Sequence, residues 1–474
     1  MYCVKLLRVG RLWPLLALLI FLYLALISHI QNIYNPLRSA PKQSALANVP
    51  PQTLYQFLNL NQEECKATFP DLTKDLDATL AQGPFTLKQA HGKGPLQARV
   101  KDGQALHAAL HQINRALQTS PSPSEIPDTI FSLNVRDQPY GTAFSYSRPA
   151  YPAPASGLPP LTRAFLMPHF AFWNWPLPFI GSMARAEKAI AEIEDSVSFE
   201  RKDPRVVWRG TVGFESVFWP TMRRDLVRAT QGKDWADVRA LDSYSYETDS
   251  ETEMKGAEKG KGGEMASGKY GKFESRGKEE GGPGDAGNTT ISRAVLAIED
   301  FCRYKYVLYT DGVTYSGRLP FLQMCNSVLV APPPAWRQLS SHLLRPVFSS
   351  DLLLSSTSTS TSPSTTSSTR DMEKIRKAWP ERYTPEEEAN AVFVAPDWSD
   401  LEDTIAYLED HPHIARGIAK RQRDLFVGKG YASPAMETCY WRALLRGWSS
   451  VVRLEPGWEE EEVESVRWEE FSIL

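Results

Sequence analysis

Residues 306–330 read YVLYTDGVTYSGRLPFLQMCNSVLV and set the expectation for the fold. The runs Tyr306–Tyr309 and Ser327–Val330 predict two short buried strands, and Arg318–Met324 between them predicts a helix. Asp311–Gly317 forms the loop that joins the first strand to this helix. Two strands joined by a crossover helix are parallel to each other. The stretch therefore predicts an α/β fold.

The same alternation of strands and helices continues on both sides of this stretch. Further strands are predicted at 129–135, 205–208 and 391–394, and further helices at 106–117, 183–193, 219–230, 401–408 and 414–426. Strands that alternate with helices are typical of parallel sheets covered by helices.

An apolar segment near the N-terminus predicts a membrane anchor. Residues 12–28 read LWPLLALLIFLYLALIS and carry no charge, which is at the short end of the range that spans a bilayer. Lys5, Arg8 and Arg11 precede it, and Arg38 is the first Lys or Arg after it. The positive-inside bias then predicts a cytosolic tail at 1–11, a transmembrane signal anchor at 12–28 and a lumenal stem at 29–64. A cleaved signal peptide is the alternative.

Two segments have a composition that cannot bury an apolar core. Residues 243–290 are rich in Gly, Glu, Lys and Ser, and a Ser/Thr tract begins near residue 349. We predict disordered inserts at 243–290 and 349–385, and an acidic tail at 446–474. The sequon Asn288-Thr289-Thr290 predicts glycosylation of Asn288 in a lumenal loop.

Charge and cysteine content exclude several classes. The formal net charge is -3 and no long basic run occurs, which argues against a nucleic-acid partner. None of the cysteines stands in a CxxC pair, so a zinc site or a thioredoxin-like motif is not expected. The four cysteines after residue 28 form an even set that suits two disulfides, and spacing leaves all three pairings open. Asp75-Leu76-Asp77 resembles a DxD metal motif, but it lies in a predicted helix and is taken as chance.

The loop after the strand at 306–309 has the chemistry of a phosphate site. Its residues Val313, Thr314, Tyr315, Ser316, Gly317 and Arg318 offer backbone N–H groups, the hydroxyls of Thr314 and Ser316, and a guanidinium. In open α/β sheets, ligands bind at the carboxyl ends of the strands, where a following helix N-terminus favours an anion. An ordinary turn with a surface arginine is the alternative. Arg209 and Thr211 follow another strand, and Arg223-Arg224-Asp225 lies further along the chain. We predict that Arg209, Thr211 and Arg224 add contacts to the same phosphates, and arginines that face solvent are the alternative.

Asp137 and an aromatic cluster are the remaining candidates. Asp137 follows a predicted strand, where a carboxylate serves either as a general base towards a hydroxyl or as the residue that shapes an Asx-turn. Phe172 and Trp173 belong to an aromatic cluster that forms either a wall for a sugar or acceptor, or plain core. His169 lies within that cluster.

Short segments scattered over most of the chain carry a resemblance to a known family. They are NVRDQP at 134–139, MP at 167–168, FW at 172–173, WRG at 208–210, RYKY at 303–306, TYSGR at 314–318, LQMCNSV at 322–328 and TCYW at 438–441. In this order they resemble the core of glycosyltransferase family 90. That family contains fungal capsule-associated xylosyltransferase-like proteins and animal protein O-glucosyltransferases.

The resemblance implies a fold, a donor and roles for several residues. It implies a GT-B fold, with an acceptor-side Rossmann-like domain at 65–200 facing a donor-side one at 201–445 across a cleft. It implies a UDP-sugar donor bound without a metal. Asp137 then matches the catalytic base, Val313–Arg318 the donor loop and Arg209–Arg224 a second donor segment.

The resemblance also implies two disulfides, and this sequence differs from the family pattern at some positions. It implies the pairs Cys65–Cys439 and Cys302–Cys325. Extra residues separate Thr211 from Arg224, and the two inserts are not part of the family core. His169 stands where fungal relatives tend to carry Asp.

Together these expectations describe a type II membrane protein of the ER or Golgi with a lumenal catalytic part. We expect an inverting, metal-independent glycosyltransferase that moves xylose or glucose from a UDP-sugar to a hydroxyl of a glycan or protein. A catalytically inactive binding or scaffold protein with the same fold is the alternative.

Overall fold

The computed structural model describes residues 58–87, 103–151, 161–177, 179–214, 216–241, 295–354, 369–456 and 470. All of them belong to one compact unit, Phe57–Leu474. The predicted anchor at 12–28, the insert at 243–290 with Asn288, and most of the acidic tail lie outside these residues. Within the described ranges, no helix combines the length and the apolar character that crossing a membrane requires.

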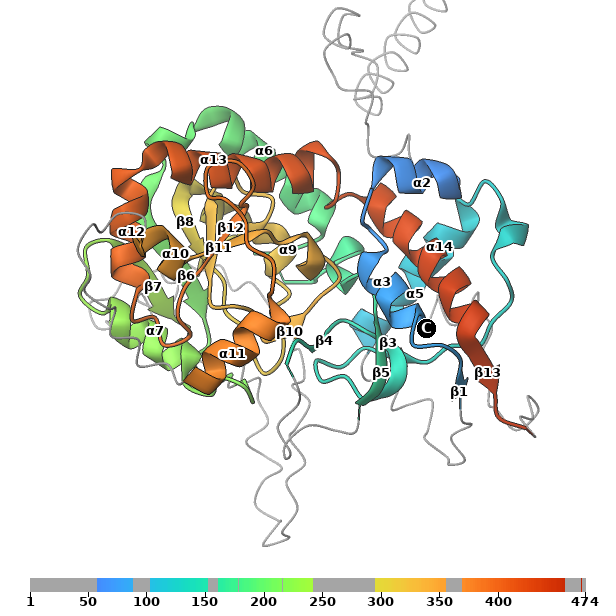
Figure 1. Ribbon diagram of the computed structural model, residues 1–474. Coiled ribbons are helices and arrows are strands. Elements are labelled where there is room, and N and C mark those ends of the chain that lie inside the picture. The colour runs from blue at the N-terminus through green and yellow to red at the C-terminus, as the bar shows by residue number, and fades with distance from the viewer. Residues whose placement is uncertain are drawn as a thin grey trace, which may run out of the picture. The chain divides into compact units, whose positions relative to one another are not determined.

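A six-stranded sheet dominates the part of the chain after residue 200 (Figure 1). Its strand order is β11-β12-β9-β8-β6-β7. The strands are β6 (Asp203–Gly210), β7 (Ala236–Ala240), β8 (Tyr304–Leu308), β9 (Val328–Ala331), β11 (Pro346–Phe348) and β12 (Ala391–Phe393). Every neighbouring pair runs parallel, which confirms the predicted α/β class.

Helices cover both faces of this sheet, and this explains the uninterrupted apolar runs of its strands. Val307 of β8 packs in one apolar cluster, whereas Tyr306 and Leu308 pack in the other. The first cluster includes residues of α6 (Met183–Ser196), α9 (Leu319–Leu322) and α11 (Thr369–Ala378). The second includes residues of α7 (Met222–Thr230), α10 (Ser349–Leu354), α12 (Leu401–Asp410) and α13 (Pro412–Arg423). Parallel strands buried on both faces need apolar side chains at successive positions.

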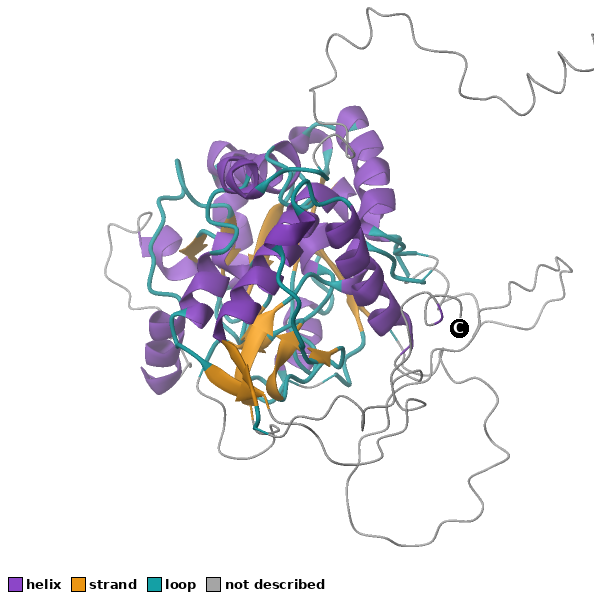
Figure 2. Ribbon diagram, turned by 90° about the vertical axis from the view of Figure 1, so that its right-hand side faces the viewer, coloured by secondary structure: helices purple, strands orange, loops and turns teal. Residues whose placement is uncertain are grey.

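A smaller parallel sheet has the order β2-β3-β5, formed by Leu133–Asn134, Gly141–Ser145 and Leu161–Leu166. Four helices accompany it, α2 (Gln62–Thr68), α3 (Lys74–Leu80), α5 (Gly103–Gln118) and α14 (Pro434–Val451). Trp448 of α14 packs edge-on against Phe144 and Phe165 of the sheet, at ring-centroid distances of 4.8 and 4.9 Å. Helix α14 is therefore part of the core around the smaller sheet. Figure 2 shows helices packed around the strands.

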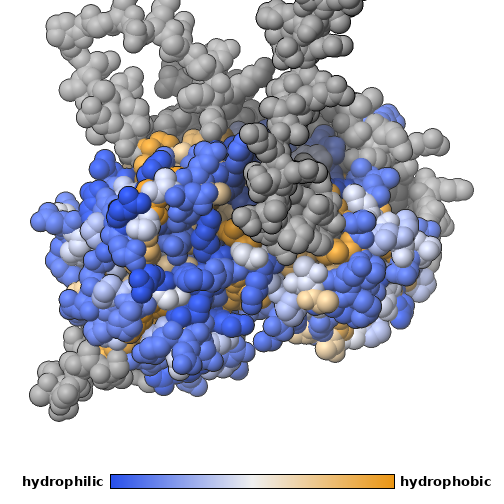
Figure 3. Space-filling model, turned by 90° about the horizontal axis from the view of Figure 1, so that it is seen from above, coloured by the Kyte–Doolittle hydropathy of each residue, from blue (hydrophilic) through white to orange (hydrophobic). Residues whose placement is uncertain are grey.

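Shorter elements complete the unit. Two small pairings are β1 (Phe85–Leu87) with β13 (Val452–Leu454) and β4 (Arg148–Pro149) with β10 (Trp336–Arg337). The 3-10 turns are Pro123–Glu125, Phe170–Phe172, Phe199–Arg201, Ile298–Arg303 and Ser341–Leu343, and Asp424–Gly428 is a π-helical turn. The face seen in Figure 3 is predominantly hydrophilic, with apolar side chains visible mainly in its hollows.

Both disulfides implied by the resemblance are present. Cys65 of α2 bonds to Cys439 of α14, and Cys302 bonds to Cys325. The first joins two cysteines that lie 374 positions apart and fastens α2 to α14.

The structure corrects several predicted elements. The predicted disordered insert at 349–385 is wrong at both ends, because α10 and α11 form there and bury Leu352 and Ile375. The helix expected at 318–324 is a single turn, α9. The strand expected at 129–135 is only two residues long, β2.

Candidate functional site

The site lies where the order of strands in the larger sheet reverses. The chain goes from β6 to β7 on one side, and then to β8 and β9 on the other. The connections at the carboxyl ends of β6 and β8 therefore diverge, and such switch points are where ligands bind in open α/β sheets. Two predicted segments leave the sheet here, 209–211 from β6 and 311–318 from β8.

Arg318 links these two segments. Its Nη1 donates to the backbone carbonyl of Arg209, and a Cβ added at Gly210 would lie 3.1 Å from its Nη2. The side chain is half-buried. Arg318 thus extends from the loop after β8 to the end of β6, and Gly210 leaves room for its guanidinium.

Arg223, rather than the predicted Arg224, is the second guanidinium at the switch point. Its Nε donates to the carbonyl of Asp311 at 2.8 Å and its Nη1 to the carbonyl of Thr211 at 2.9 Å, so it bridges β8 to β6. Burial lowers the pKa of Arg223 to about 10, which leaves it charged at neutral pH. Arg224 is exposed. Helical spacing distinguishes the two arginines in the sequence. Arg223 lies three residues before the buried Leu226 and therefore on the same, buried face of α7.

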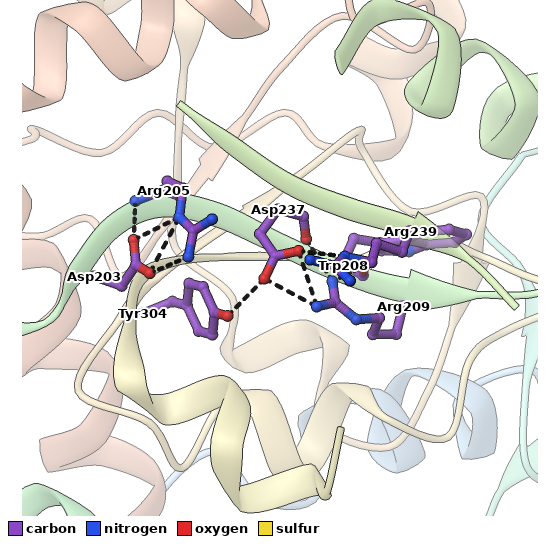
Figure 4. Close-up of polar contacts among 7 residues, drawn as sticks. All are labelled: Asp203, Arg205, Trp208, Arg209, Asp237, Arg239 and Tyr304. Carbon is purple, nitrogen blue, oxygen red and sulfur yellow. Dashed lines mark hydrogen bonds and ion pairs between the residues drawn. The ribbon is translucent and has the colours of Figure 1, made fainter. Parts of the chain in front are cut away.

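Arg209 pairs with an acidic residue on the neighbouring strand. Its Nη2 lies 2.9 Å from both carboxylate oxygens of Asp237 on β7, as Figure 4 shows. Asp237 also accepts from Tyr304 at 2.6 Å and from Arg239 at 3.0 Å. Burial raises the pKa of Asp237, but the hydrogen bonds from Arg209 and Tyr304 outweigh it and lower that pKa to about 2. The guanidinium of Arg209 is therefore engaged by Asp237, and only its backbone carbonyl meets Arg318.

A buried network fixes the loop after β8. Tyr309 donates its hydroxyl to Asp311 at 3.0 Å and accepts from the Ser316 N–H and from Gln338, each also at 3.0 Å. The N–H of Ala335 donates to the other Asp311 oxygen at 2.7 Å. Burial raises the pKa of Asp311 to about 7. The amide of Ser316 is thus already bonded within the protein, and the loop is held in one shape.

Asn134, not Asp137, forms the Asx-turn after β2. Its Oδ1 accepts from the N–H of Arg136 at 3.1 Å, and its Nδ2 donates to the carbonyl of Gln138 at 2.8 Å. Asp137 is exposed, and within the described part of the chain its carboxylate has no hydrogen-bond partner. The turn chemistry therefore leaves the carboxylate of Asp137 available to a ligand.

The turn at Asp137 contacts the loop after β8. Thr314 donates its hydroxyl to the backbone carbonyl of Asp137 at 2.9 Å. Although Asp137 is exposed, desolvation by the surrounding protein raises its pKa. Its charge also helps to raise the pKa of the buried Tyr146, after desolvation. The 313–318 loop therefore lies next to the turn that carries Asp137.

The aromatic side chains pack beside the same loop. Tyr315 is buried, with ring centroids 6.3 Å from Tyr146 and 5.8 Å from His169. A Cβ added at Gly317 would lie only 2.6 Å from Nε2 of His169, so this position needs glycine for close approach. Nδ1 of His169 accepts from the N–H of Ala171 at 3.2 Å, and burial lowers its pKa to about 3. His169 is therefore a neutral packing residue here.

Phe172 and Trp173 point into different surroundings. Phe172 is buried and lines a cavity together with His169. Trp173 is 40% exposed and stacks on His111, with ring centroids 4.7 Å apart and planes at 4°. The guanidinium of Arg115 lies 5.2 Å from the same ring. The two residues thus do not form one wall.

Comparison with known proteins gives two matches. Residues 108–349, about half of the chain, match the model of a family described as glycosyl transferase family 90. This range contains Asp137, Arg223 and the 313–318 loop. An O-glucosyltransferase rumi homolog from Aedes aegypti is 26% identical over 160 residues. That alignment covers 34% of this chain and 30% of the relative, so it spans less than a third of the relative's length.

Proposed function

The chain belongs to glycosyl transferase family 90, and we propose that it moves xylose or glucose from a UDP-sugar to a hydroxyl of a glycan or protein. The observation that carries this proposal is the contact between the Asp137 turn and the 313–318 loop. It brings the turn that carries the solvent-accessible Asp137 next to the loop after β8. Arg223 and Arg318 bond to backbone carbonyls at the ends of β8 and β6. The Aedes relative is named for transfer of glucose, which supports a sugar donor of this kind.

The donor's diphosphate binds at the switch point between β6 and β8. Arg318 and Arg223 supply positive charge, and backbone N–H groups of the 313–318 loop add hydrogen bonds. Guanidinium groups suit phosphate oxygens because they offer several N–H donors in one plane. Two such groups can carry the charge of the leaving diphosphate, so we expect no metal to be required.

Asp137 acts as the base in a single displacement. Its carboxylate takes the proton from the acceptor hydroxyl while the acceptor oxygen bonds to the anomeric carbon. The bond between that carbon and the diphosphate oxygen breaks, UDP leaves with the electron pair, and the anomeric configuration inverts. The raised pKa of Asp137 makes the carboxylate a stronger base than an ordinary aspartate. Charge on UDP is stabilised by Arg318 and Arg223.

The wider architecture follows the family. We propose that the smaller and larger sheets belong to the two Rossmann-like domains of a GT-B fold, and that residues 12–28 anchor the chain with its catalytic part in the lumen of the ER or Golgi. The two disulfides support an oxidising compartment.

A transfer assay tests the proposal. The part of the chain after residue 28 is incubated with UDP-xylose, UDP-glucose and other UDP-sugars, with glycan and peptide acceptors, with and without EDTA. We expect transfer from one of these donors, insensitivity to EDTA, and a product whose anomeric configuration, read by NMR, is inverted. UDP binding without transfer or hydrolysis of any donor would instead favour the inactive binding protein.

A further inference from the structure

The hydroxyl of Thr314 has an unexpected partner. It was expected to bind donor phosphate, yet it donates to the backbone carbonyl of Asp137 at 2.9 Å. Thr314 is only 1% exposed, so the hydroxyl is enclosed. A hydroxyl has one hydrogen and donates to one acceptor at a time. While this bond is made, Thr314 cannot also donate to a phosphate.

Neighbouring contacts strengthen the same junction. Tyr315 packs its ring against Tyr146, and Tyr146 and Ser147 directly follow β3. The hydroxyl of Ser147 reaches the Asp137 carbonyl as well, at 3.5 Å. The Asp137 carbonyl therefore accepts from two segments, from Ser147 after β3 and from Thr314 in the loop after β8.

The other end of the Thr314 segment is equally fixed. Ser316 donates its N–H to Tyr309, which is tied to the buried Asp311. Thr314 accepts at its own carbonyl from the N–H of Gly312 at 2.9 Å. A rigid loop thus presents the hydroxyl of Thr314 to the turn that carries Asp137.

We propose that Thr314 is a positioning residue, which fixes the Asp137 carboxylate relative to the donor loop through the Asp137 backbone. The inference rests on the proposed function, because it assumes that Asp137 is the base and that the 313–318 loop binds the donor. Its consequence is a separation of effects. Loss of the Thr314 hydroxyl slows the transfer step, whereas the donor keeps its contacts with Arg318 and Arg223.

Thr314→Val tests this, because valine keeps the shape of threonine and replaces its hydroxyl with a methyl group. A base that drifts by about an ångström loses roughly 10–100-fold in kcat. We expect a fall of this size in Thr314→Val, unchanged affinity for UDP by calorimetry, and recovery of most of the activity in Thr314→Ser. Hydrogen exchange of a peptide covering residues 134–140 should become faster in Thr314→Val only.

Thr404→Val is the matched control. Thr404 of α12 is fully buried and donates its hydroxyl to the carbonyl of Asp400 at 2.6 Å. Thr404→Val therefore removes the same kind of hydrogen bond from a helix that packs on the larger sheet. We expect its kcat to match that of the unmodified protein.

The outcomes separate the two proposals. Unchanged kcat and unchanged exchange in Thr314→Val would overturn the positioning role. An equal loss of UDP affinity and of kcat would also overturn it, because Thr314 would then be a donor ligand. If the unmodified protein transfers no sugar, the proposed function fails, while the exchange measurement still decides whether the hydroxyl holds the Asp137 turn.

Discussion

Arg223 and Arg224 differ by one position, and the structure assigns them different roles. Arg223 is buried and bridges the carbonyls of Thr211 and Asp311, whereas Arg224 is exposed. The perturbation is therefore Arg223→Ala, with Arg224→Ala as a control that removes the same side chain next to it.

The size of the effect follows from the bonds that Arg223 makes. A hydrogen bond from a charged donor contributes roughly 1.5–3 kcal/mol, so removing two lowers the free energy of unfolding by about 3–6 kcal/mol. Loss of one further contact of this strength to the donor diphosphate weakens UDP binding by about 10–150-fold. A surface substitution such as Arg224→Ala changes stability by about 0.5 kcal/mol or less.

Urea denaturation measures the stability of both variants, and calorimetry measures UDP affinity at a temperature where both are folded. We expect Arg223→Ala to lose stability and UDP affinity, and Arg224→Ala to keep both. The reasoning is refuted if Arg224→Ala weakens UDP binding more than Arg223→Ala does. Such a result would favour Arg224, the residue predicted from the sequence as a donor contact.

Three further predictions follow from the packing and electrostatics. Desolvation raises the pKa of Asp137, so its carboxylate becomes protonated at a higher pH than an ordinary aspartate as the pH falls. The acid limb of the kcat/KM profile should therefore lie above the ordinary aspartate pKa of about 4, and a limb at or below that value would contradict the assignment. Gly317→Ala places a methyl group against His169 and should cost roughly 1–3 kcal/mol of stability, seen as a lower Tm. Replacing Cys65 and Cys439 by Ser opens the long covalent loop and should lower the free energy of unfolding by roughly 2–5 kcal/mol in urea, and an unchanged midpoint would speak against this.

The parallel sheet was predictable because its strands are buried on both faces. Tyr306 to Leu308 contribute to two different apolar clusters, so each position must be apolar and the run stands out in the sequence. Helices α10 and α11 were not predicted, because the sequence around them is mostly polar. Leu352 begins a run of three leucines between serine-rich stretches, and Ile375 stands between Lys374 and Arg376. Only the tertiary contacts show that both side chains are buried.

The site was predictable at the level of segments and less so at the level of side chains. The loop after β8 and the end of β6 were found because glycines and cations follow strands. The direction of each side chain depends on partners far away in the chain, as with Arg209, which pairs with Asp237 on the neighbouring strand. The contact of Thr314 with Asp137 spans 177 residues and leaves no local pattern.

Asp137→Asn tests the central claim most directly, because it removes the base while preserving the size of the side chain. Transfer of sugar and binding of UDP are measured on the same preparation. The proposed mechanism predicts a fall in kcat of roughly 10²–10⁴-fold, with the dissociation constant for UDP unchanged. Turnover equal to that of the unmodified protein would contradict it.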